Sequence, residues 1–153
     1  MTEEFQSWKV LDKRRFLLAL MKELAGDARV SFEGDLRKTS LTTMPGAIEE
    51  PTTTLKRNTK WPKQDFVIVP LEPSTGNKIM AAIGGTVPGA ILHIQIEKEG
   101  QLQFGAYDCF HPECIYFKDG IDRSFVDSMV AQGLIRPYTK RRPQRTRKRP
   151  AAK

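Results

Sequence analysis

Two cysteines and a histidine are the side chains best suited to chemistry, and they lie within the segment Cys109-Phe-His-Pro-Glu-Cys114. Thiolates and imidazole are ligands that zinc accepts, but a closed structural zinc site has four ligands. The second histidine, His93, is predicted opposite Gly105 in a hairpin, and Cys109 follows about 13 Å further along at ~3.3 Å per residue. His93 is therefore a poor fourth ligand. Cys109, His111 and Cys114 remain candidate metal ligands, and we predict no cofactor.

The same segment offers the residue types of a thiol nucleophile and its base, but catalysis requires them to meet in space. No spacing in the sequence indicates such a meeting, so we predict no catalytic residue and expect a protein that is not an enzyme. The alternative interpretation is structural. In it the cysteines pack as small apolar side chains and His111-Pro112 forms a turn.

A second segment, Lys56-Arg-Asn-Thr-Lys-Trp-Pro-Lys63, combines cations with an aromatic ring. Cations neutralise phosphates, and a base stacked on an aromatic ring contributes roughly 1–3 kcal/mol. We therefore predict that Lys56, Arg57, Lys60, Trp61 and Lys63 contact nucleic acid. The alternative is that Trp61 covers one end of the core while the lysines keep the loop soluble.

The strongest functional signal is the end of the chain, where eight cations and no acid occur between Thr139 and Lys153. Dense cations without apolar neighbours bind polyanions by releasing counterions and need no folded scaffold. The predicted nucleic-acid contacts in this segment are Lys140, Arg141, Arg142, Arg145, Arg147, Lys148 and Arg149. Nothing in the segment can present side chains to base edges in a fixed geometry, so the expected binding is nonspecific.

This basic segment accounts for the charge of the whole chain, which has 153 residues, 25 Lys and Arg, 18 Asp and Glu, and a net charge of +7. Residues 1–138 hold the other 17 cations against all 18 acids, a charge of −1. The whole chain has 39% hydrophobic residues, which is enough to bury a core. We predict a single domain over 1–138 with a long loop at 39–54, and a disordered basic tail at 139–153.

Other features bound the location of the protein. The acidic, polar start is unlike a secretory signal, and the longest apolar run, Phe16 to Met21, is far shorter than the ~20 residues of a membrane helix. Two cysteines are too few for a disulfide framework. We expect a cytoplasmic protein, or a nuclear one in a eukaryote, that binds no membrane.

Periodicity predicts the elements that position these segments. Apolar residues between Ser7 and Gly26 have helical spacing, with Ser7 as the cap and Gly26 at the end. Strands are predicted from Ala28, at Phe66 to Val69, at Lys78 to Ile83 and at Ile91 to Glu97. A last helix is capped by Asp122 or Ser124 and closed by Gly133.

Ile91 to Glu97 and Gln101 to Asp108 predict a hairpin around the three-residue loop Lys98-Glu99-Gly100. In this register Leu92, Ile94 and Ile96 lie opposite Ala106, Phe104 and Leu102. The sequence thus predicts an α+β fold, with an N-terminal helix, an antiparallel sheet of about five or six strands, a C-terminal helix and the basic tail.

Three hypotheses on function follow. The first is a non-enzymatic accessory protein whose tail binds nucleic acid nonspecifically, aided by Lys56 to Lys63. The second is a protein-interaction module of the immunity, inhibitor or chaperone kind, in which the tail only solubilises. The third is a small zinc- or thiol-dependent protein centred on Cys109, His111 and Cys114. Nucleic acid, a protein partner, or both are therefore the expected partners.

Overall fold

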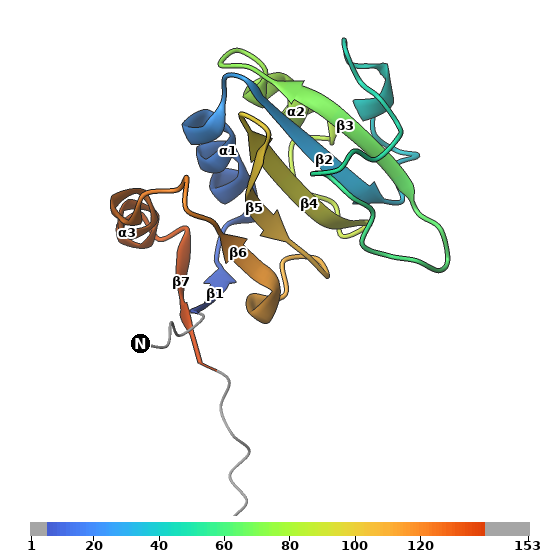
Figure 1. The fold of residues 1–153 in the computed structure, drawn as a ribbon. Helices are drawn as coiled ribbons and strands as arrows, with labels where there is room; N and C mark the ends of the chain where they lie inside the picture. Colours follow the sequence, from blue (N-terminus) through green and yellow to red (C-terminus); the bar gives the residue numbers. More distant parts are fainter. Residues whose placement is uncertain (1–5, 140–153) are drawn as a thin grey trace, which may run out of the picture.

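The structure is a computed structural model that describes residues 6–139, and Figure 1 shows its ribbon. Ten helices and strands follow one another in chain order: β1 (Ser7–Val10), α1 (Lys13–Leu24), β2 (Ala28–Gly34), β3 (Asp65–Leu71), α2 (Gly76–Ala82), β4 (Ile91–Lys98), β5 (Gln101–Ala106), β6 (Ile115–Phe117), α3 (Arg123–Ala131) and β7 (Ile135–Tyr138). Two short 3₁₀ helices, η1 (Leu41–Thr43) and η2 (Pro112–Cys114), lie between them.

The central feature is a five-stranded antiparallel sheet with the order β3-β2-β4-β5-β6, and β1 and β7 form a separate two-stranded sheet. The α+β class predicted from the sequence is confirmed. No helix within residues 6–139 has the length and apolarity that crossing a membrane requires.

The predicted start of the first helix is wrong. Ser7 to Val10 form β1, which pairs with β7, and the helix begins only at Lys13. Its cap is Asp12, whose carboxylate accepts the backbone N–H of Arg15 at 3.0 Å. Of the predicted apolar stripe, Leu17, Leu20, Met21 and Leu24 are buried in α1, whereas Leu11 precedes the helix and is 48% exposed.

The end of α1 is capped from a distant strand. Lys98, the last residue of β4, donates its ammonium group to the carbonyls of Leu24, Ala25 and Gly26 at 3.1, 2.9 and 2.7 Å. Cations favour the C-terminal end of a helix, where carbonyls lack partners. Lys98 therefore ties α1 to the central sheet.

The segment Lys78 to Ile83, predicted as a strand, is helical and lies within α2 and its C-cap. Its Ile79, Met80 and Ile83 are buried, and the spacing i, i+1, i+4 places them on one face of a helix, whereas neighbouring residues of a strand point to opposite faces. Gly76 at the start of α2 approaches α1 closely, since a Cβ atom there would lie 3.6 Å from the Cβ of Met21. The run is short, and packing against α1 decides its conformation.

The predicted hairpin is present, but the predicted register is wrong. Ile94 pairs with Ala106 and Ile96 with Phe104, and the connection is a two-residue turn in which Glu99 and Gly100 have φ values of 53° and 79°. Two positive φ values match the twist of the flanking strands better than the predicted three-residue loop. A bulge after Ile96 then absorbs one extra residue on β5 and moves Leu102 to the other face of the sheet.

At the C-terminal end, Gly133 with φ 75° closes α3, and the backbone N–H of Leu134 donates to Met129 at 3.0 Å. The chain then continues as β7 and returns to β1. Figure 1 shows α3 and this two-stranded sheet beside the β6 end of the main sheet. Residues 140–153, and with them the predicted basic tail, lie outside the described residues.

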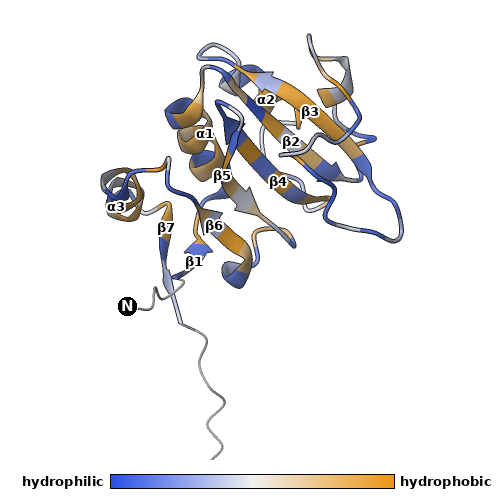
Figure 2. Ribbon diagram, in the orientation of Figure 1, coloured by the Kyte–Doolittle hydropathy of each residue, from blue (hydrophilic) through white to orange (hydrophobic). Residues whose placement is uncertain are grey.

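The two faces of the central sheet differ in character. One face packs with α1 and α2 around Phe16, Phe32 and Phe104, which are fully buried. The other face carries a small apolar cluster of Leu55, Phe66 and Ile68, with Leu102 beside it. Figure 2 shows the contrast between apolar strands and the hydrophilic loop that leads into β3. This second face positions the candidate site.

Candidate nucleic-acid interface

The loop Lys56–Lys63 lies on the second face of the sheet, and a buried carboxylate holds its backbone. Glu33 of β2 is 1% exposed and accepts the backbone N–H groups of Asn58 at 2.7 Å and Thr59 at 3.2 Å. Hydrogen bonds to a charged acceptor are the stronger kind, and burial shields them from water. Glu33 therefore fixes the middle of the loop.

A buried amide on the neighbouring strand holds the start of the loop. Gln95 of β4 donates its Nε2 to the carbonyl of Lys56 at 2.8 Å and to the Oγ of Ser31 at 3.1 Å. Its Oε1 accepts the hydroxyl of Tyr107 at 3.3 Å. Every polar atom of the buried amide thus has a partner within the described chain.

His93 provides a third attachment for the loop. Its Nδ1 accepts the backbone N–H of Asp108 at 3.2 Å, so Nε2 carries the proton and donates to the Oγ1 of Thr59 at 2.7 Å. Both ring nitrogens are occupied, and His93 is buried under the loop. His93 therefore supports the loop, and neither of its ring nitrogens is free to bind a metal.

Of the four predicted cations in the loop, Arg57 turns inward. Its Nη1 donates to the carbonyl of Gln64 at 2.6 Å, and its guanidinium lies 5.1 Å from the centre of the Phe66 ring. Lys56, Lys60 and Lys63 are exposed and form no ion pair with any other residue in 6–139. Three lysines therefore present free charge, while Arg57 stabilises the loop.

Trp61 is 85% exposed, so it does not cover the end of the core. The structural alternative considered for this residue is therefore wrong. A large aromatic side chain in water, on a loop held by buried hydrogen bonds, offers its ring surface to a ligand. The structure brings Trp61 together with Lys60 and Lys63 at one exposed tip.

The two predicted nucleic-acid segments are not brought together at their attachment points. The basic contacts in 140–149 lie outside the described residues, but the strand that precedes them, β7, is described. In Figure 1 the end of β7 and the loop before β3 lie on different sides of the molecule. The loop therefore forms a separate surface.

The cysteine segment forms a tight left-handed turn. Asp108, Cys109 and Phe110 have φ values of 54°, 57° and 63°, and the Sγ of Cys109 donates to the carbonyl of Gly89 at 3.2 Å. His111 uses its Nδ1 to accept the backbone N–H of Glu113 at 3.1 Å. The turn predicted at His111-Pro112 is thus present, and it forms the start of η2.

Within residues 6–139, no group of three or more His, Cys, Asp and Glu residues is placed to hold a metal ion. Burial raises the pKa of the Cys114 thiol above its ordinary value, and the nearby carboxylates of Asp108 and Glu113 raise it further. A redox-sensing or nucleophilic thiol needs a lowered pKa. The environment of Cys114 therefore opposes thiol chemistry.

Sequence reasoning missed the row of polar and aromatic residues on the second face. Ser31, Glu33, His93 and Gln95 alternate with core residues, and that pattern is also typical of a solvated outer face. Tyr116 lies between Ile115 and Phe117 in β6, a strand that was not predicted. The alternation Ile-Tyr-Phe-Lys was the available signal for it.

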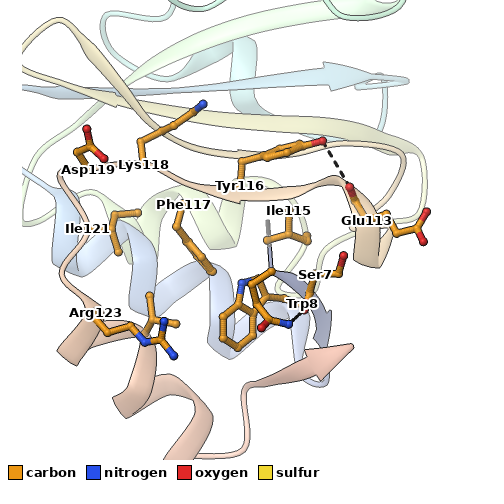
Figure 3. A pocket seen from close by; sticks show the side chains of 12 residues that line it. Ser7, Trp8, Glu113, Ile115, Tyr116, Phe117, Lys118, Asp119, Ile121 and Arg123 are labelled. Atoms are coloured by element: carbon orange, nitrogen blue, oxygen red, sulfur yellow. Dashed lines mark hydrogen bonds between the residues drawn. The ribbon is translucent and has the colours of Figure 1, made fainter. Parts of the chain in front are cut away.

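A groove of about 670 Å³ lies between β1, β6 and the start of α3. Figure 3 shows Trp8 and Phe117 facing each other in it, with ring centres 5.9 Å apart in an edge-to-face arrangement. Tyr107 N–H donates to the carbonyl of Cys114, and Lys118 N–H to that of Gln103, so the backbone groups of Ile115 and Phe117 point away from β5. Within the described residues, no strand pairs with this edge.

No protein-family model, no curated protein and no solved structure significantly matches the chain.

Proposed function

We propose that this protein is a non-enzymatic accessory protein that binds nucleic acid without sequence specificity, through the Lys56–Lys63 loop and the basic segment 139–153. The observation that carries the proposal is Trp61, which is 85% exposed on a loop held by Glu33, Gln95 and His93. A solvated tryptophan has no role in the core, and its surroundings are cationic.

The fixed loop supports binding because its shape exists before a ligand arrives. Ordering a mobile loop opposes association, whereas a preorganised loop avoids that loss. Lys56, Lys60 and Lys63 can neutralise phosphates while the indole of Trp61 stacks on a base. These interactions tolerate any base, so they predict affinity without sequence preference.

The basic segment supports the same function by charge. Its eight cations release counterions from a polyanion and make binding dependent on salt. It lacks aromatic residues, so it supplies general attraction, and the loop supplies contact with bases.

The test is a salt titration of oligonucleotide binding by fluorescence anisotropy, with the full chain, a chain ending at residue 138, and Trp61→Ala. We expect deletion of 139–153 to weaken binding and flatten its salt dependence. Trp61→Ala should weaken binding roughly 5- to 150-fold at every salt concentration, the range that corresponds to ~1–3 kcal/mol per stacked base.

Lys22→Ala, an exposed cation on α1, serves as the matched control and should change little. Binding by the tail-deleted chain as tight as that of the full chain would exclude the basic segment as the contact. Unchanged affinity of Trp61→Ala would exclude the loop as a contact for nucleic acid.

The groove beside β6 favours a second candidate, the protein-interaction module. Its exposed backbone edge can pair with an extended segment of a partner. A chain ending at residue 138 should then retain a stoichiometric protein partner, and Ser7→Arg, which places a bulky side chain in the groove, should release it. Failure to retain any partner would count against this function.

A further inference from the structure

The second face of the sheet continues beyond the loop into an aromatic surface. The strand register aligns Ser31 of β2, Gln95 of β4, Gly105 of β5 and Tyr116 of β6 in one row across the sheet. Gln95 also bonds the carbonyl of Lys56, so the row begins under the Lys56–Lys63 loop. At about 4.8 Å per strand, the row spans ~14 Å.

Tyr107 lies across this row because Gly105 has no side chain. A Cβ atom at Gly105 would come within 2.5 Å of the Tyr107 hydroxyl and 2.9 Å of its ring. The ring centre of Tyr107 is 5.6 Å from that of His93 and 6.0 Å from that of Tyr116. The hydroxyl bond to Gln95 completes the support, so Tyr107 bridges the loop side and the β6 side of this face.

Tyr116 is the exposed end of the row. It is 40% exposed, its hydroxyl donates to the carbonyl of Glu113 at 3.4 Å, and the Nζ of Lys118 lies 6.0 Å from its ring centre. Figure 3 shows Tyr116 and Lys118 on one side of β6 and Phe117 on the other. The core therefore does not use Tyr116, and a cation stands beside its ring.

We propose that Tyr107 and Tyr116, together with Trp61, form a surface that selects unpaired nucleotides, so that the preferred ligand is single-stranded nucleic acid. This inference rests on the proposed function and names its ligand. Ring faces fixed on a protein can stack only on bases whose own faces are free, and duplex bases are already stacked on one another. Lys56, Lys60, Lys63 and Lys118 lie on the same face for the phosphates.

The local charge explains why selection must come from stacking. Glu113 and Asp119 are exposed, line the same groove as Tyr116 and Lys118, and offset the charge of Lys118. Attraction of phosphates at this end of the surface is therefore weak, whereas stacking does not depend on salt. Binding through the basic segment falls steeply with salt for single and double strands alike. The preference for single strands should consequently increase as salt is added.

The experiment compares a single-stranded DNA oligonucleotide with the duplex of the same sequence, by anisotropy at low and high salt, using the full chain. The variants are Tyr116→Ala, Tyr116→Phe, and Gly105→Ala, which displaces the Tyr107 ring while keeping the tyrosine. Tyr138→Ala is the matched control, since this tyrosine lies in β7 and outside the row. Thermal unfolding of each variant verifies the fold.

We expect Tyr116→Ala to reduce single-strand affinity roughly 5- to 150-fold with little change for the duplex, while Tyr116→Phe and Tyr138→Ala behave like the unaltered protein. Gly105→Ala should reduce single-strand affinity as well. Equal affinity for the single strand and the duplex, with no effect of Tyr116→Ala, would overturn the selection of unpaired nucleotides. The proposed function would still stand. Binding of neither oligonucleotide would overturn the proposed function itself.

Discussion

Glu33 illustrates how one buried side chain controls an exposed surface. Its carboxylate is 1% exposed and accepts two backbone N–H groups from the loop that carries Trp61. In the sequence it lies on the polar side of an alternating strand and resembles a solvated residue. Its role follows only from the loop that folds over it.

Glu33→Gln should loosen the loop. The amide offers one acceptor atom where the carboxylate offers two, so one backbone N–H loses its partner, at a cost of about 1–3 kcal/mol. Denaturant unfolding should show this loss of stability, and oligonucleotide binding should weaken with it. Glu72→Gln, at an exposed glutamate, is the control and should leave both unchanged. Normal stability of Glu33→Gln would show that the carboxylate does not hold the loop.

Cys114 should react slowly with alkylating reagents near neutral pH. Burial and the neighbouring Asp108 and Glu113 raise the pKa of its thiol, so less thiolate is present at a given pH. In Cys109→Ser, the midpoint of the alkylation rate against pH should lie above that of the same variant in denaturant. Asp108→Asn should lower the midpoint, because it removes one of the carboxylates. A pH midpoint below that of the denatured protein would instead support the hypothesis of a thiol-dependent protein.

Among the helices and strands, the first helix and the hairpin show where local sequence patterns fail to predict the structure. Val10 fits the helical stripe in sequence, yet it belongs to a strand because Ile135 of β7 pairs with it. The hairpin has its predicted strands but a different turn. The helix start depends on a partner far away in the chain, whereas the turn depends on the twist of the two strands that it joins.

Asp12→Ala should destabilise α1 by about 1 kcal/mol, since it removes the side chain that caps the helix. Thermal unfolding measures this loss. Ser7→Ala provides the discriminating control, because Ser7 is the cap only if the helix begins where the sequence predicted. A larger loss for Ser7→Ala than for Asp12→Ala would contradict the observed helix start.

Glu99→Asn should stabilise the hairpin by up to about 1 kcal/mol. Glu99 has a φ of 53°, a region that costs most residues energy and that asparagine adopts readily. In the three-residue loop predicted from the sequence, Glu99 would have negative φ and the substitution would have no such benefit. Denaturant unfolding of this variant therefore distinguishes the two turns.

In the whole molecule, the net positive charge is concentrated in 139–153, whereas the loop that presents Trp61 belongs to the near-neutral part of the chain. Residues 1–138 are close to neutral at −1, while the eight cations of 139–153 follow directly after β7. The loop that presents Trp61 lies on a different side of the molecule from β7 in Figure 1. Each surface should therefore contribute to binding independently of the other.

Deleting 139–153 and replacing Trp61 with alanine should have additive effects on the free energy of nucleic-acid binding. Effects of distant sites without shared partners add within about 0.3–0.5 kcal/mol. A double-mutant cycle on an oligonucleotide long enough to contact both surfaces in one complex measures the sum. A coupling well above that range would mean that the basic segment reaches the loop when the ligand binds.

Features that depend on composition and local periodicity can be predicted from the amino-acid sequence. These are the segregation of charge at 139–153, the α+β class, the apolar stripe of α1, and the presence of strands at Ile91 to Glu97 and Gln101 to Asp108. Amphipathic spacing reports which side chains seek a core, and short-range spacing is sufficient for that. The cation-rich loop with Trp61 was also visible in this way.

Only the tertiary structure decided which partner each segment found. It set the β1–β7 pairing, the register of β4 on β5, the helical form of α2, and the exposure of Trp61. It also placed Tyr107 and Tyr116 on the same face as the loop. Pairing and burial energies depend on residues far apart in the chain: Glu33 becomes a buried anchor only because Asn58 and Thr59 fold over it, and no local pattern encodes that meeting.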